Sequence, residues 1–179
     1  MHLTLKIKDA DRILPDQQTL TEAAMRAVEV TVKRHLREKD ASATHKPGFP
    51  KSGYYMDAAR NGINAYAQGK TAVVEIEKEG LALHYEGGTV YPKKKALAIP
   101  IDPSVADIWP SEASGIATGD GYAMIWPKGS NHGFIKDAET NDLLWLLVPK
   151  ATIPADKTVL PEEETILSAA EAAIWSCCA

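Results

Sequence analysis

Apolar and polar residues alternate at the start of the chain and then change to a helical period. Residues 1–8, MHLTLKIK, alternate one by one, which is typical of a β-strand. Residues 16–39 carry a stripe at steps of three and four, formed by Thr21, Met25, Val28, Val32 and Leu36. This stripe predicts a long helix that packs on other elements, with Thr19 and Glu22 spaced as a capping box and Asp16 as an alternative N-cap.

Residues 41–53, ASATHKPGFPKSG, interrupt both patterns. They are rich in Ser, Pro and Gly and have no apolar period, so we expect an extended, mobile linker there. Helical spacing returns in residues 54–67, through Tyr55, Ala58, Ala59, Ile63 and Tyr66. Gly69 follows where such a helix would end, which predicts a second, shorter helix.

From residue 70 the period changes from 3.6 to 2, which indicates a sheet. Residues 72–77 and 81–86 alternate around the turn Lys78-Glu79-Gly80. They predict a hairpin, which would place His84 in a strand.

A second hairpin is predicted after the turn Gly87-Gly88. Its strands would be residues 89–91 and 97–101, joined by the basic tip Lys93-Lys94-Lys95. Pro100 has no N–H for a ladder, so its strand lies at a sheet edge or ends there.

The rest of the chain contains one more hairpin, the most apolar run and a final helix. The predicted elements are an irregular stretch at 102–120 with a turn of helix near 104–108, a hairpin of 121–126 with 134–136, a central strand at 143–148, an extended segment at 151–160 and a helix at 162–175. Carboxylates at the start of this helix suit the positive end of its dipole.

These elements predict an α+β fold, with a long N-terminal helix and shorter helices packed on a mainly antiparallel β-sheet. We expect residues 1–160 to form a single domain and residues 161–179 to add a C-terminal helix and tail. We expect a single hydrophobic core, since a chain of 179 residues buries roughly two-thirds of its surface on folding and needs no disulfide or metal for stability.

Charge and hydropathy narrow the classes of partner. The formal net charge of −4 argues against a general polyanion binder, because non-specific nucleic-acid affinity comes from cations that displace counterions. The start of the chain lacks the apolar run of a signal peptide, and no run approaches the ~20 residues of a membrane span. We therefore expect a cytoplasmic protein with no membrane contact.

Residues that carry chemistry do not gather in any recognisable motif. The five histidines lack the spacing of paired metal ligands: His2, His35, His45, His84 and His132. The acids of the 102–120 region match no calcium loop: Asp102, Asp107, Glu112 and Asp120. Cys177 and Cys178 are adjacent near the end, where a reduced, frayed tail is expected. We expect no catalytic, metal or cofactor-binding residue, no cofactor and no enzymatic activity.

The basic tip is the sharpest local feature. Three adjacent like charges must be solvated or face an acidic partner. A solvated tip that discourages edge pairing is the simpler interpretation, and a contact with DNA or an acidic protein is the alternative. Trp109 and Trp126 each precede a proline and would suit subunit contacts, since aromatic residues are enriched at interfaces.

Residues 85–100, YEGGTVYPKKKALAIP, resemble the signature of the virion-morphogenesis and minor-tail proteins of Mu-like and related tailed phages, the tail-completion families. The order of the parts is similar as well, and the run at 143–148 is followed by Thr-Ile-Pro-Ala at 152–155. The resemblance covers most of residues 20–160. After residue 155 many members have an arginine and a phenylalanine, whereas this chain continues Asp156-Lys157-Thr158-Val159.

The resemblance implies a structural subunit that acts in tail completion and head-tail joining and is part of the virion after assembly in the host cytoplasm. Its implied partners are copies of itself in a ring, the phage connector and tail-tube proteins, and DNA through a weak contact. The residues expected to make assembly contacts are Gly87, Gly88, Tyr91, Lys93, Lys94, Lys95 and Trp109.

Two other classes stay open from the sequence. One is a small hydrolase with a loop-borne site near His132, which requires a carboxylate and a hydroxyl beside that ring. The other is a nucleic-acid binding module that uses the basic tip with Tyr91 and Trp126.

Overall fold

The computed structural model describes residues 2–6, 17–110 and 121–178. Contacts divide the chain into two compact units. Unit 1 comprises Met1–Ala43, Gly53–Gly87 and Pro154–Ala179, and unit 2 comprises Thr44–Ser52 and Gly88–Ile153. Each unit has its own cluster of buried apolar residues, whereas length alone favours one core.

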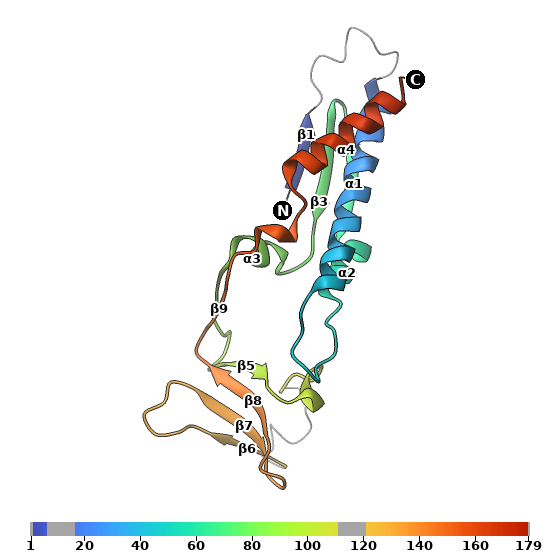
Figure 1. Ribbon diagram of the computed structural model, residues 1–179. Coiled ribbons are helices and arrows are strands. Elements are labelled where there is room, and N and C mark those ends of the chain that lie inside the picture. Colours follow the sequence, from blue (N-terminus) through green and yellow to red (C-terminus); the bar gives the residue numbers. More distant parts are fainter. Residues whose placement is uncertain (1, 7–16, 111–120, 179) are drawn as a thin grey trace. The chain divides into compact units, whose positions relative to one another are not determined.

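The fold is α+β, as the sequence predicts. The elements of unit 1 are β1 His2–Lys6, α1 Gln17–Ser42, α2 Tyr54–Asn61, β2 Ile63–Gln68, β3 Thr71–Ile76, α3 Leu81–Glu86, the 3-10 turn η3 Lys157–Val159 and α4 Glu163–Ser176. Its antiparallel sheet has the order β1-β3-β2. Helix α4 packs along α1, and α1 contacts β2 and β3 (Figure 1). The predicted N-terminal strand, long helix and C-terminal helix are therefore confirmed.

Helix α1 supplies one wall of the core of unit 1. Its buried apolar face is formed by Leu20, Ala24, Val28, Val32 and Leu36. Thr21 is also buried, and its hydroxyl donates to the carbonyl of Gln17 at 2.9 Å. Because the helix already begins at Gln17, Thr19 lies in its first turn and the predicted capping box is wrong. The alternative cap, Asp16, lies outside the described residues.

Two predicted elements of unit 1 have the wrong type. Residues 63–68 form strand β2 and do not continue helix α2, which ends where the N–H of Gly62 donates to the carbonyl of Ala58 at 3.0 Å. Strands β2 and β3 then pair as a tight hairpin, from Ile63↔Ile76 to Gln68↔Thr71, with Gly69 at φ +59° in the turn. Gly69 therefore turns a hairpin and does not end a helix.

Residues 81–86 form the short helix α3 and not the partner strand of β3. Gly80 precedes it at φ +80°. Leu81 is buried and Tyr85 packs against the same core, and their spacing of four residues places both on one face of a helix. His84 therefore lies in a helix, so its predicted place in a strand is wrong.

Unit 2 is built on antiparallel strands. Its elements are β4 Gly88–Val90, β5 Leu97–Pro100, the 3-10 turn η2 Pro103–Val105, β6 Tyr122–Ile125, β7 Gly133–Asp137, β8 Leu143–Val148 and β9 Ala151–Ile153. The larger sheet has the order β5-β8-β7-β6 (Figure 1), and β4 pairs with β9. The predicted hairpin appears as β6 and β7, and the apolar run is the interior strand β8. Pro100 is the last residue of edge strand β5, which confirms that prediction too.

The predicted second hairpin does not form, because its strands belong to different sheets. Strand β4 pairs with β9 and β5 pairs with β8. The sequence 88–100 thus finds its partners in residues 143–153. Lys93-Lys94-Lys95 connects two sheets and is not a hairpin tip.

Residues 44–52, part of the predicted linker, belong to unit 2. The Lys46 ammonium donates to the carbonyl of Ile101 at 3.2 Å and lies 4.9 Å from the centre of the Phe49 ring. No helix among residues 2–6, 17–110 and 121–178 combines the length and apolar character that crossing a membrane requires.

Candidate assembly surface

Among the residues that the structure describes, unit 2 carries most of the large apolar side chains that are exposed. In this unit they are Tyr91, Ile99, Ile108, Trp109, Met124, Ile125, Trp126 and Leu143, and in unit 1 they are Val30, Tyr66, Leu167 and Trp175. Single exposed apolar residues are normal, but several on neighbouring elements indicate an interaction surface. In unit 2 six of them lie on or beside the two edge strands of the larger sheet, β5 and β6, whereas Tyr91 follows β4 and Leu143 begins the interior strand β8.

Strand β6 forms one edge of this sheet. Among the described residues, no strand pairs with its outer side. Met124 is 63% exposed, and Ile125 and Trp126 continue the apolar surface. Gly133 leaves room for the Trp126 indole, because a Cβ at position 133 would lie 2.7 Å from Trp126 Cδ2. The edge therefore presents exposed apolar side chains, and Gly133 leaves space for the largest of them.

Strand β5 forms the opposite edge and borders a cleft. The cleft has a volume of about 410 Å³, within the range of ligand pockets. Its walls are Ala98, Ile99 and Pro100 of β5, residues 106–110 after η2, and Trp145 of β8. Asp107 is the charged residue of this lining.

Trp145 is the largest buried side chain of unit 2 and is one of the residues that line this cleft. It is 1% exposed and packs edge-on against Tyr122, with ring centroids 6.0 Å apart. Its indole N–H is buried and has no hydrogen-bond partner among the described residues. Leaving such a donor buried without a partner costs roughly 1–3 kcal/mol.

The predicted contact residues fall into three places. Lys93, Lys94 and Lys95 are exposed in the connection from β4 to β5, beside the exposed Tyr91. Trp109 lines the cleft and is 65% exposed. Gly87 and Gly88 instead shape the backbone where α3 passes into β4.

Gly87 has a steric role that sequence reasoning missed. Its backbone lies at φ +74° and ψ 170°, a region that is essentially restricted to glycine. A Cβ there would lie 2.6 Å from the backbone nitrogen of Ala155. Glycine at this position thus lets two distant segments of unit 1 come together.

Unit 1 contains a cluster of polar aromatic and charged groups that no sequence motif predicted. The His84 ring stacks on Tyr54 at 5.0 Å, and the Tyr55 hydroxyl lies 3.2 Å from His84 Nδ1. Burial raises the pKa of Tyr55 from its ordinary value, and the charge of Lys39 opposes this shift. The residues come from α1, α2 and α3, so no local spacing could have revealed the cluster.

The hydrolase alternative requires a hydroxyl and a carboxylate beside the His132 ring, and the structure places a hydroxyl there. The Ser130 hydroxyl lies 2.9 Å from His132 Nδ1, and the Asn131 amide oxygen lies 3.3 Å from the same atom. Among the described residues, these are the polar groups that contact the ring, and neither is a carboxylate.

Acidic and metal-ligating residues are dispersed where the structure describes them. In residues 2–6, 17–110 and 121–178, no three His, Cys, Asp or Glu side chains could hold a metal ion together. Asp102 accepts from the backbone N–H of Ser104 at 2.8 Å and caps η2. Glu112 and Asp120 lie outside the described residues, and Cys177 and Cys178 are exposed after α4.

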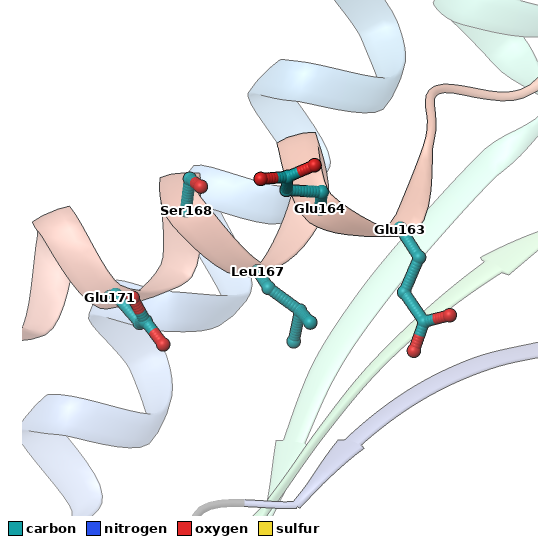
Figure 2. Close-up of a pocket in the computed structure, with 5 residues that line it drawn as sticks. All are labelled: Glu163, Glu164, Leu167, Ser168 and Glu171. Carbon is teal, nitrogen blue, oxygen red and sulfur yellow. The ribbon is translucent and has the colours of Figure 1, made fainter.

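A second hollow lies on the outer face of α4. Figure 2 shows the side chains that line it, which all come from this helix: Glu163, Glu164, Leu167, Ser168 and Glu171. Its volume is about 560 Å³. Ile166 and Ala170, on the buried face of α4, join the core of unit 1. The hollow is thus an acidic groove on an exposed helix face.

No protein-family model, curated protein or solved structure matches this chain. The candidate surface therefore stands on the residues of the chain itself.

Proposed function

We propose that this protein is a structural subunit of a bacteriophage or prophage tail that acts in tail completion and head-tail joining. One observation carries the proposal: both edges of the larger sheet of unit 2 bear exposed apolar side chains. Such edges readily add a strand from another chain. The particular assembly is suggested by the resemblance of residues 85–100 and 152–155 to tail-completion proteins.

The two strings that carry this resemblance are neighbours in space. Gly88 pairs with Ile153, and Gly87 lies against Ala155. Each string therefore constrains the other, since only glycine leaves room at position 87. This mutual constraint supports reading the strings as one motif.

The proposed partners follow from the surface. Copies of the chain would meet through the apolar sheet edges and form a ring in the virion. The exposed Lys93-Lys94-Lys95 connection would face an acidic surface of a connector or tail-tube protein, or a DNA backbone, because three adjacent cations need anionic neighbours or water.

The solution mass of the purified protein tests self-assembly. We expect light scattering to give a multiple of 19.4 kDa and electron microscopy to show rings. Mass spectrometry of virions induced from the source cells should then detect the chain. A mass of 19.4 kDa at every concentration, together with absence from purified virions, would contradict the proposal.

A further inference from the structure

We infer that copies of this chain join head to tail, with strand β6 of one copy added to strand β5 of the next and Met124 inserted into the cleft at Trp145. This inference rests on the proposed self-assembly and names the surface that performs it. It follows from the strand directions, from the faces of the sheet and from the shapes of its two edges.

The strand directions suit this addition. Each neighbouring pair in the order β5-β8-β7-β6 is antiparallel, so β6 runs opposite to β5. A second copy placed in the same orientation brings its β6 antiparallel to the β5 of the first. The sheet then continues from copy to copy with the alternation of directions unbroken.

The register places the relevant side chains on one face. Met124 is opposite Ile135, Ile135 is opposite Trp145, and Trp145 is opposite Pro100. Side chains that are directly opposite across a pair lie on the same face of a sheet. An added β6 therefore presents its Met124 on the face where Pro100 and Trp145 line the cleft, and its Ile125 on the face of Ile99.

The two edges have complementary shapes. The β6 edge presents a long exposed side chain, since Met124 is the most exposed large side chain of that strand. The β5 edge is hollowed by the cleft. Two β5 edges would bring two hollows together, and two β6 edges would bring two such side chains together. Only the heterologous pairing fills the cleft.

The chemistry of methionine suits the cleft. Its unbranched side chain adapts to an irregular apolar hollow, and its sulfur makes favourable contacts with aromatic rings such as Trp109 and Trp145. On the other face, Ile125 of the added strand would cover the exposed Ile99.

Cross-linking between two single-cysteine variants tests the pairing. Both are made in a background of Cys177→Ser and Cys178→Ser: one carries Ala98→Cys on β5 and the other carries Met124→Cys on β6. Light scattering first establishes that each variant assembles. A short bismaleimide is then added to each variant alone and to their mixture, so that either register of the added strand is within reach.

We expect a cross-linked dimer in the mixture and only the 19.4 kDa chain in either variant alone. A dimer from Ala98→Cys alone, or from Met124→Cys alone, would show a two-fold pairing and overturn the inference. Assembled protein without any cross-link would overturn the inference and leave the proposed function standing. A monomeric parent protein would overturn the inference, and together with absence from purified virions it would overturn the proposed function as well.

An independent measurement uses the strength of self-association. Met124→Asp should raise the dissociation constant of self-association by about tenfold or more, as substitution of an interface hot spot does. Leu143→Asp is the matched control, because Leu143 is also exposed but belongs to the interior strand β8. Equal effects of the two substitutions would contradict a contact at the β6 edge.

Discussion

The Lys39 ammonium donates a hydrogen bond to Asp156 Oδ2 at 2.7 Å and so joins helix α1 to the start of η3. The same ammonium reaches the Thr158 hydroxyl at 2.6 Å. The hydrogen bond from Lys39, followed by the one from Thr158, lowers the pKa of Asp156 to about 2. The segment that departs from the tail-completion pattern, residues 156–159, is thus anchored on the long helix.

This ion pair predicts a specific dependence of stability on pH. The pKa of Asp156 is lower in the folded chain than in the unfolded chain, so its contribution is present above about pH 4 and is lost as the pH falls through 2. Asp156→Asn should therefore lower the urea midpoint at pH 7, and the difference from the parent should shrink toward pH 2. A difference that is constant over this range would contradict the assignment.

Gly87→Ala should destabilise unit 1 strongly. The substitution combines a backbone conformation restricted to glycine with a clash at Ala155, and we expect a loss of at least about 3 kcal/mol in the free energy of unfolding. Gly69→Ala is the control, since Gly69 has positive φ but nothing within 4 Å of an added Cβ. It should cost about 1 kcal/mol. Denaturation followed by circular dichroism measures both, and similar losses would refute the steric argument.

Leu36→Ala should open a cavity in the core of unit 1. Leu36 is fully buried on α1, and such a truncation costs about 2–5 kcal/mol. Val30→Ala on the same helix serves as the control, because Val30 is 62% exposed. Its effect should stay within about 0.5 kcal/mol. Urea unfolding curves compare the two, and a loss for Val30→Ala as large as for Leu36→Ala would argue against the placement of α1.

Hydrogen exchange should change on assembly at two sites. We expect the amides of residues 93–95 and of residues 41–53 to exchange more slowly in the assembled protein than in the free chain. The basic connection is proposed to face a partner, and we expect the predicted linker at 41–53 to become a contact surface in the ring as well. Mass spectrometry of peptides from both states measures the difference. Equal protection in the two states would defeat this expectation.

The local sequence pattern was sufficient to predict those elements whose apolar residues fit only one period, that of a helix or that of a strand. The apolar stripe on α1 repeats over several helical turns. In a strand of that length, about half of these apolar side chains would face the solvent. The run at 143–148 is apolar at every position and suits an interior strand, which is paired on both sides. The start of α4 could also be predicted from neighbouring residues, because a proline followed by carboxylates is typical of the first turn of a helix.

Short segments fit both the helical and the strand period. The elements that pair or pack with them determined which of the two structures they form. Residues 63–68 alternate through Ile63, Ala65 and Ala67, yet Ile63 and Tyr66 also have helical spacing. Pairing with β3 selected the strand. Leu81 and Tyr85 suited a strand and a helix equally, and β3 was already paired on both sides by β1 and β2.

The fold class, the two longest helices, the β6–β7 hairpin and the place of Pro100 at a sheet edge could be predicted from residues that are near one another in the chain. Three relations became visible in the folded chain alone: residues 88–100 pair with 143–153, Gly87 meets Ala155, and Pro100 and Trp145 border one cleft. Those relations join residues that are distant in sequence. They form only when burial of apolar side chains brings the strands together.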